Sequence, residues 1–540
     1  LTNPPAAVYV SRMDFPRVPG SRRHLLLVQI LVLSGACTSA KLVSSGRSEG
    51  PAGSDPFHDL LVTADACAAP PPATIMRGQA LDDLDRVERI VRRGYSGFDV
   101  LNLGGVDWNE TFRRARAALN GTPEPIPVDS FRRFLIDALS LTRDGHLAFW
   151  TLATHGESRW GSTGAHQDVF AANVVLTRAG DGWAIERSRD PAGSPGSLVL
   201  DCAGQPLGDL LRLTITGDPL EPAWLLARMS TEPPGPLRCR IQSGDTIRET
   251  QLSLHRLRAS EPAPLAAAPA FESSGTEILR IRLRNLGDSD QASMQSFVAT
   301  APLARSARAV VADIRGNPGG NDAFVRSWFQ GLTAGPLHYV AIDELESEVT
   351  LQGNVNFLAC RLASKSLDPA YRPHVQQMLA TARSRLEDAS ARRQPFRRWS
   401  VSSPTYQGEA SSPFSGTLVV LVDSACGSSC ESFVMYARQV PGTLIVGENT
   451  AGVGVYGDVR PFHLAASRIW MLAGTKWFHD SPGARVPPEG SGYMPDIWID
   501  SEDASKEAEA IALCLTRHPC GPALRHAIEM QKSPAAPAGR

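Results

Sequence analysis

Short runs of apolar residues recur through the second half of the chain, and each run is long enough for one strand. Residues 417–422 form one such run and residues 443–446 another, and segments 278–283 and 307–314 are two further expected strands. Continuous apolar stretches of this length are typical of strands buried on both faces, as in a parallel sheet covered by helices. Segments 290–300 and 431–440 fall between these runs and are expected to be helices. This alternation predicts an α/β core over residues 270–500.

The first half of the chain shows two other patterns. Apolar residues at three- and four-residue steps, with charges between them, predict a helical domain over residues 76–150. Residues 160–260 instead contain short apolar segments interrupted by Gly and Pro, which predicts a β-rich module. Its expected strands are residues 169–177, 183–189, 197–202, 237–242 and 250–255.

Two further segments depart from the rhythm of the core. Residues 328–413 contain a charged stretch, 371–397, that reads as a helix. We therefore expect this segment to be an inserted helical arm without chemistry of its own. Residues 501–540 are expected to form a C-terminal helix, over 503–516, and a tail.

The N-terminal residues have the pattern of an export signal. Arg22 and Arg23 precede an apolar run, residues 25–33, and small residues then lead to Cys37. This predicts a signal peptide within residues 1–40, a Ser/Gly/Ala/Pro-rich linker over 41–75, and a location in the periplasm or cell envelope. The segment before Cys37 resembles a lipoprotein processing site with one residue too many. Two outcomes stay open: a lipid anchor at Cys37, or cleavage after Ala36 or Ala40.

Charge and cysteine content narrow the classes of partner and cofactor. With 54 Lys and Arg against 56 Asp and Glu, the net charge of −2 favours neither nucleic acid nor an anionic membrane. The sequence contains no CxxC pair and no HExxH pattern, so we expect no metal site. The candidate chemistry described below needs no organic cofactor either. Oligomeric state is left open.

The nine cysteines predict disulfides, because eight remain if Cys37 carries a lipid and the compartment is oxidising. Cys202 with Cys239 and Cys514 with Cys520 are the expected pairs. Cys426 and Cys430 either form a disulfide or are two small buried thiols.

Ser428 is the candidate nucleophile. It follows the apolar run 417–422 and precedes the expected helix 431–440, so it lies at a strand-to-helix turn. The partly positive N-terminus of a helix stabilises an oxyanion there. The alternative is that Ser428 and Ser429 only cap the helix.

Three other segments carry candidate chemistry. His146 stands where a helix gives way to an extended segment, and Glu489 stands in a loop braced by Gly and Pro, as suits a carboxylate that orients a histidine. Gly319 and Gly320 follow the buried strand 307–314, and their backbone N–H groups could approach a ligand closely. The alternatives are a structural histidine, a solvated carboxylate and a simple tight turn.

Four segments in this order resemble the tail-specific, or carboxyl-terminal processing, serine peptidase family and its tricorn-like branch. They are Asp144-Gly-His146, Asp313-Ile-Arg-Gly-Asn-Pro-Gly-Gly320, Ser424–Glu431 with Val446–Gly452, and Glu489–Asp496. The resemblance spans residues 80–500. It implies a crotonase/ClpP-like core of repeated ββα units, with an N-terminal helical cap and a PDZ-like module.

One position departs from the bacterial type of this family. That type uses a Ser/Lys dyad with the lysine shortly after Gly452, where this chain has Val453. Valine cannot accept the serine proton, and the nearest lysine, Lys476, lies in a different segment. The tricorn-like branch instead uses a histidine from the cap and a glutamate from the loop before Pro-Asp, and His146 and Glu489 match those positions.

The resemblance therefore implies an exported serine peptidase that acts on peptides or unfolded protein ends. Ser428, His146 and Glu489 would form the triad, with the oxyanion held by N–H groups of Ser429 and of the turn at Gly319 and Gly320. Two alternatives stay open. One is a catalytically inactive binding or scaffold protein of the envelope, favoured by Val453 and by the absence of a Gly-Leu-Gly-Phe loop in the PDZ-like module. The other is an esterase-like hydrolase with the same triad.

Overall fold

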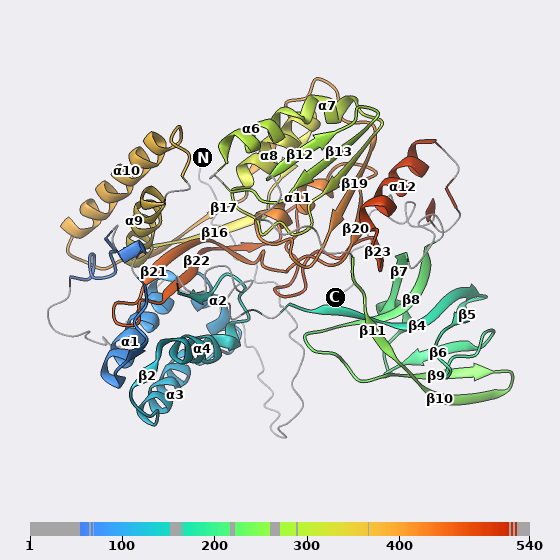
Figure 1. The fold of residues 1–540 in the computed structure, drawn as a ribbon, viewed down its shortest axis with the longest axis horizontal. Coiled ribbons are helices and arrows are strands. Elements are labelled where there is room, and N and C mark those ends of the chain that lie inside the picture. Colours follow the sequence, from blue (N-terminus) through green and yellow to red (C-terminus); the bar gives the residue numbers. More distant parts are fainter. Residues whose placement is uncertain are drawn as a thin grey trace, which may run out of the picture. The chain divides into compact units, whose positions relative to one another are not determined.

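A computed structural model describes most of the chain after Ser54 (Figure 1). The described residues are 55–63, 66–68, 70–151, 164, 166–215, 222–259, 270–287, 290–364, 367–517, 520–521 and 524–525. The predicted signal peptide and Cys37 lie outside these ranges, as do parts of the predicted linker and tail. None of the helices in the described ranges combines the length and the apolar character that crossing a bilayer requires.

The core is a parallel sheet, as the apolar runs predict. Strands β13, β14, β19, β20 and β23 are parallel neighbours, and β12 adds an antiparallel edge. The strands are β12 (Phe271–Ser274), β13 (Ile278–Leu283), β14 (Ala309–Asp313), β19 (Thr417–Val422), β20 (Leu444–Gly447) and β23 (Ile497–Ile499).

Helices cover both faces of this sheet. Alternate strand residues divide between two apolar clusters: Val310 and Val420 pack with α6, α8 and α11, whereas Val311 and Val419 pack with α12. A strand covered on both faces, such as β19, is apolar at nearly every position, whereas β13 exposes Arg280 and Arg282. The helices are α6 (Gln291–Ala299), α7 (Ala301–Ser306), α8 (Asp322–Leu332), α11 (Ser429–Ala437) and α12 (Ala504–Arg517).

The β-rich module continues the same sheet instead of forming a separate one. Strand β7 pairs in parallel with β23, so one sheet runs from β10 through the module into the core. The sequence pattern missed β7 and β8. The elements are β4 (Asp168–Ala179), β5 (Gly182–Ser188), β6 (Leu198–Cys202), α5 (Leu207–Leu210), β7 (Leu211–Ile215), β8 (Ala223–Ser230), β9 (Leu237–Ser243), β10 (Thr246–Leu252) and β11 (Leu254–Arg256).

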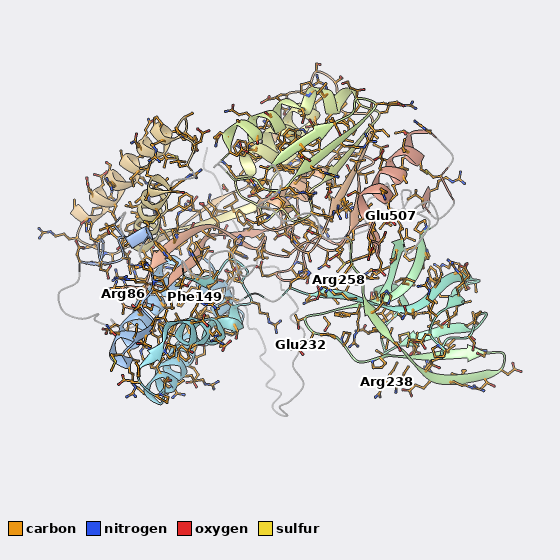
Figure 2. All side chains as sticks on the ribbon, in the orientation of Figure 1. Arg86, Phe149, Glu232, Arg238, Arg258 and Glu507 are labelled. Carbon is orange, nitrogen blue, oxygen red and sulfur yellow. A yellow bond between two sulfur atoms is a disulfide. The ribbon has the colours of Figure 1, made fainter. Side chains whose placement is uncertain are left out.

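The N-terminal helices pack on a second sheet, with strand order β17-β16-β22-β21. Strand β3 pairs with β22, and Phe149 of β3, labelled in Figure 2, is buried in the cluster that these helices and strands share. The elements are η1 (Ala66–Ala68), β1 (Thr74–Ile75), α1 (Arg77–Gly94), α2 (Gly97–Leu103), α3 (Trp108–Asn120), β2 (Ile126–Pro127), α4 (Val128–Leu139), η2 (Ser140–Thr142), β3 (Ala148–Trp150), β21 (Tyr456–His463) and β22 (Trp470–His479).

The segment expected to be a helical arm is only partly helical. It contributes β16 and β17 to the second sheet, and its expected start at Trp328 falls inside α8. Strand β16 pairs with β22, more than a hundred residues further along the chain, which no local pattern reveals. The elements are β15 (Pro336–His338), β16 (Ala341–Ser347), α9 (Glu348–Ala363), α10 (Arg372–Ala391), β17 (Arg397–Ser402) and β18 (Thr405–Gln407).

Four disulfides link all the cysteines other than Cys37. The two expected pairs, Cys202–Cys239 and Cys514–Cys520, are confirmed. Cys426 and Cys430 are joined, which resolves the alternative left open by the sequence. The fourth pair, Cys67–Cys360, spans 293 residues, and the sequence pattern does not predict it.

Candidate active site

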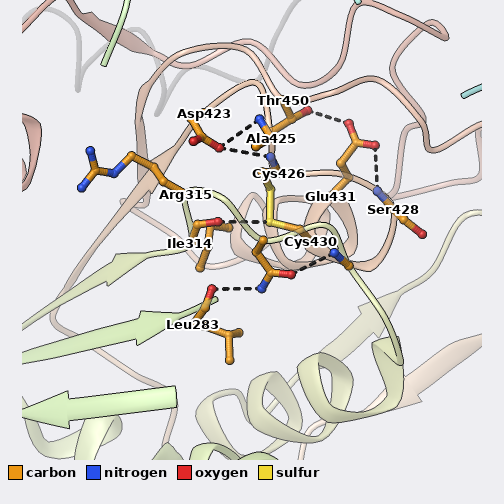
Figure 3. The surroundings of a disulfide bond; sticks show 12 residues. Leu283, Ile314, Arg315, Asp423, Ala425, Cys426, Ser428, Cys430, Glu431 and Thr450 are labelled. Carbon is orange, nitrogen blue, oxygen red and sulfur yellow. Dashed lines mark hydrogen bonds between the residues drawn. A yellow bond between two sulfur atoms is a disulfide. The ribbon is translucent and has the colours of Figure 1, made fainter. Parts of the chain in front are cut away.

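Ser428 lies in the turn between β19 and α11, where its backbone is strained. Its φ of 55° and ψ of −123° lie outside the regions that side chains other than glycine usually adopt. Such conformations cost about 1–3 kcal/mol and cluster at functional sites. The carboxylate of Asp423 braces the turn by accepting N–H groups of Ala425 at 3.0 Å and Cys426 at 3.1 Å (Figure 3). Ser428 itself is partly exposed.

The loop after β14 lies directly against this turn. A Cβ atom built on Gly319, whose φ is +98°, would stand 2.6 Å from the carbonyl oxygen of Gly427 and 2.9 Å from Cβ of Ser428. Only glycine permits this approach. The N–H of Gly427 donates to the carbonyl oxygen of Asn317 at 3.1 Å, and the hydroxyl of Ser429 donates to that of Gly320 at 2.7 Å. Two adjacent strand ends thus form one edge of the site.

The backbone N–H groups of this edge are not all available to a ligand. The N–H of Gly319 donates to the side-chain oxygen of Asn317 at 2.9 Å. Within the described part of the chain, the N–H groups of Gly320 and Ser429 donate no hydrogen bond. Two of the three expected oxyanion donors therefore remain free.

The side chain of Val453 lies against both Gly145, which precedes His146, and Gly427, which precedes Ser428. A Cβ built on Gly145 would lie 2.1 Å from Cγ1 of Val453, and one built on Gly427 would lie 2.9 Å from Cγ2 of the same side chain. Gly145 precedes His146 and Gly427 precedes Ser428. The turn that carries Ser428 and the segment that carries His146 are therefore separated by little more than one valine side chain.

His146 is 5% exposed and sits between η2 and β3. Burial lowers the pKa of its imidazole to about 4, although a hydrogen bond with the backbone of Tyr456 opposes that shift. The imidazole is consequently neutral near pH 7, as a general base must be.

Glu489 joins the histidine segment through the backbone. Its two carboxylate oxygens accept the N–H of Gly145 at 3.0 Å and the N–H of Val455 at 3.1 Å. The sequence predicts that Glu489 orients the imidazole of His146. In the structure Glu489 instead accepts a hydrogen bond from Gly145, the residue before His146. Burial and then the charge of Asp144 raise the pKa of Glu489 well above its ordinary value.

Asp144 is a second carboxylate beside the histidine. Its Oδ1 accepts the N–H of His146 at 2.7 Å. Burial raises the pKa of Asp144 to about 6, and the hydrogen bond from the backbone N–H of His146 opposes the shift. The histidine segment is therefore anchored from both sides by carboxylates.

Glu431 is a site residue that sequence reasoning missed. Its buried carboxylate accepts hydrogen bonds from the hydroxyl of Thr450 at 2.6 Å, the N–H of Gly452 at 3.0 Å and the N–H of Val453 at 2.9 Å. It also accepts the N–H of Ser428 at 3.3 Å (Figure 3). Burial raises its pKa. The spacing Ser428-x-x-Glu431 is that of a capping box, which could have indicated the residue.

Lys476 is not a substitute base. Its ammonium pairs with Asp458 at 3.0 Å and with Glu344 at 3.9 Å. Burial alone would lower the pKa of Lys476, but the two carboxylates outweigh burial and raise it. Among the described residues, no group of three or more His, Cys, Asp or Glu side chains could hold a metal ion.

Comparison with known proteins identifies the family of the core. Residues 277–499 match the model of peptidase family S41. The core of this chain belongs to peptidase family S41. The tail-specific peptidase resemblance and the α/β peptidase fold are therefore confirmed, and the S41 core is that of a serine-type peptidase. A search of curated proteins finds no significant match.

Three solved structures illustrate the range of the similarity. Mature CPAF is 15% identical, with a TM-score of 0.43 over 84% of this chain and 98% of its own. The photosystem II D1 C-terminal processing protease is 15% identical, with a TM-score of 0.31 over 78% and 93%. The tricorn protease is 12% identical, with a TM-score of 0.34 over 84% and 37%. At these scores, the family assignment rests on the match of residues 277–499.

Proposed function

We propose that this S41 peptidase cleaves peptides or unfolded protein ends through Ser428, His146 and Glu489, by way of an acyl-enzyme. The observation that carries the proposal is the position of Val453 between Gly145 and Gly427. It makes a strained serine and a buried neutral histidine, 282 residues apart in sequence, neighbours in space.

Each residue has a distinct role in the proposed reaction. Ser428 attacks the peptide carbonyl, and His146 takes the serine proton and passes it to the leaving amine. The imidazolium then forms in a segment whose backbone N–H groups donate to Asp144 and Glu489. A nearby positive charge favours the ionised form of a carboxyl group, so the raised pKa of each falls as the charge appears. Glu489 therefore stabilises the imidazolium and, through Gly145, holds the histidine segment in place.

The oxyanion is assigned to the N–H groups of Ser429 and Gly320. The N–H of Gly319 keeps its bond to Asn317 and shapes the loop. Ser429 is the first residue of α11, so the partly positive helix terminus adds to its N–H. Removing one such donor typically lowers kcat by about 10²–10³-fold.

Export to the periplasm or cell envelope is part of the proposal. Four disulfides in one chain favour an oxidising compartment. A lipid anchor at Cys37 stays a prediction from the sequence. The alternatives are an inactive binding protein and an esterase-like hydrolase, and the retained Ser, His and Glu oppose the former.

The test is labelling of the purified protein, lacking residues before Ala40, with a fluorophosphonate probe. Parallel samples carry Ser428→Ala, His146→Ala and Glu489→Gln, and fluorescein-labelled β-casein and p-nitrophenyl acetate serve as substrates. We expect labelling to disappear with the first two substitutions and weaken with the third. Equal, faint labelling of all four would overturn the triad, and ester hydrolysis without casein cleavage would favour the esterase.

A further inference from the structure

We propose that the disulfide between Cys426 and Cys430 is a positioning element for the nucleophile, so that acylation of Ser428 requires this bond to be oxidised. The inference rests on the proposed function of Ser428. It assigns the disulfide a part in catalysis beyond holding the fold together.

The first observation is where the bond lies. Cys426 and Cys430 flank Ser428 by two residues on each side, so the disulfide closes a ring with the strained residue at its centre. Both cysteines are fully buried, with 0% exposure, in the cluster beneath α11. A strained backbone persists only where its surroundings over-determine it. The covalent ring is one such constraint, and it acts on the nucleophile directly.

The second observation is what the two cysteines touch. The carbonyl oxygen of Cys426 accepts the N–H of Ala451 at 2.8 Å, in the loop that leads to Val453. Sγ of Cys430 lies 3.5 Å from the carbonyl oxygen of Ile314, at the start of the loop that carries Gly319 and Gly320 (Figure 3). The two bonded cysteines therefore contact both neighbouring loops, Cys426 through its carbonyl oxygen on the base side and Cys430 through its sulfur on the oxyanion side.

Reduction changes these contacts in a defined way. A dithiol reductant supplies two electrons and two protons, the S–S bond breaks, two thiols form, and the reductant becomes a disulfide. The ring around Ser428 is then open. The new S–H group of Cys430 can donate to the carbonyl oxygen of Ile314, which the oxidised sulfur cannot do. Ser428 is left to relax toward an unstrained conformation, away from the geometry needed for attack.

The chain offers a matched control in its β-rich module. Cys202 and Cys239 also form a buried disulfide, with exposures of 0% and 1%, between paired residues of β6 and β9. Neither residue takes part in the proposed site. Removing that pair creates a similar loss of buried sulfur without touching the nucleophile turn.

The experiment compares Cys426→Ala/Cys430→Ala with Cys202→Ala/Cys239→Ala and the unmodified protein, using fluorophosphonate labelling kinetics. We expect the maximal labelling rate of the first variant to fall about tenfold to a hundredfold, as for a displaced reacting group, with the half-saturating probe concentration within about twofold. The control variant should label at the unmodified rate. Circular dichroism should be the same for all three proteins.

A second measurement holds even where the double variant does not fold. The unmodified protein is equilibrated in graded dithiothreitol, and isotope-coded alkylation with mass spectrometry counts the reduced fraction of each cysteine pair. We expect the labelling rate to fall in proportion to the reduced fraction of Cys426–Cys430 and not of Cys202–Cys239. A protein that labels at full rate with this pair reduced or replaced overturns the positioning role alone. An unmodified, oxidised protein that does not label at all overturns the proposed function with it.

Discussion

The nucleophile side and the base side of the candidate site are built in opposite ways. Ser428, its capping residue Glu431 and its disulfide come from one continuous stretch, 416–454. On the base side, Asp144 and His146 come from the N-terminal part, Glu489 comes from a loop near the C-terminus, and Val455 follows β20. The nucleophile side is therefore built from residues close together in the sequence, and the base side is assembled by folding from distant parts of the chain.

This difference has a physical consequence for how each side holds its geometry. On the nucleophile side, the backbone of Ser428 is strained, and a disulfide and hydrogen bonds hold the turn in that conformation. On the base side, the unfavourable contribution is the burial of ionisable groups, which shifts the pKa values of Asp144, His146 and Glu489 from their ordinary ones. Geometric substitutions should therefore damage the first side, and charge substitutions the second.

Replacing the base should have the largest effect. With His146→Ala, no group takes the serine proton, and we expect kcat/KM for labelled β-casein to fall by about 10³-fold or more. The nucleophile turn should stay folded, since its bonds are local. His463→Ala, at a histidine in β21 outside the proposed site, is the control. A loss of less than tenfold would show that the base side does not act as proposed.

A geometric change on the nucleophile side should rank second. Gly319→Ala places a Cβ 2.6 Å from the carbonyl oxygen of Gly427 and forces a φ of +98° on alanine. We expect kcat to fall about a hundredfold, because the displaced loop moves the N–H of Gly320 away from the oxyanion. Gly208→Ala, where a Cβ would meet nothing within 4 Å, should leave kcat unchanged. Unaltered kinetics for Gly319→Ala would contradict the close approach of the two loops.

A change of charge on the base side should rank third. Glu489→Gln removes the carboxylate charge but keeps one oxygen that can accept the N–H of Gly145. We expect kcat to fall about tenfold, because the imidazolium loses a stabilising charge while the segment keeps part of its anchor. Steady-state kinetics alongside Glu387→Gln on α10 measure this. A loss as large as that of His146→Ala would mean that Glu489 does more than orient and stabilise.

The smallest effect should be that of mild acid. The pKa of His146 is lowered to about 4, so the imidazole stays neutral well below the ordinary histidine pKa of about 6.5. We expect protonation of His146 itself to change kcat/KM less than about threefold between pH 7.5 and 5.5, and kcat/KM to fall as pH approaches 4 and the base is protonated. Circular dichroism at each pH separates this from unfolding. A half-maximal rate near pH 6.5 would contradict a buried base.

Much of the fold and of the nucleophile side could be predicted before the structure. The apolar runs that became β19 and β20 indicate a parallel sheet covered on both faces, and β13 and β14 were expected as strands of the same core. The even number of cysteines other than Cys37 indicated disulfides, and Cys202 with Cys239 was an expected pair. Glu431 was missed although its spacing from Ser428 is that of a capping box.

The sequence by itself determined the local parts of this protein: buried strands, the strand-to-helix turn at Ser428, and the glycines that let two loops approach. These depend on interactions between residues close in the chain. Tertiary structure alone decided that Val453 separates Gly145 from Gly427, that Glu489 bonds the backbone of Gly145, and that β7 joins β23. Contacts across hundreds of residues arise only when packed elements meet, and the pKa values of His146 and Glu489 follow from that burial.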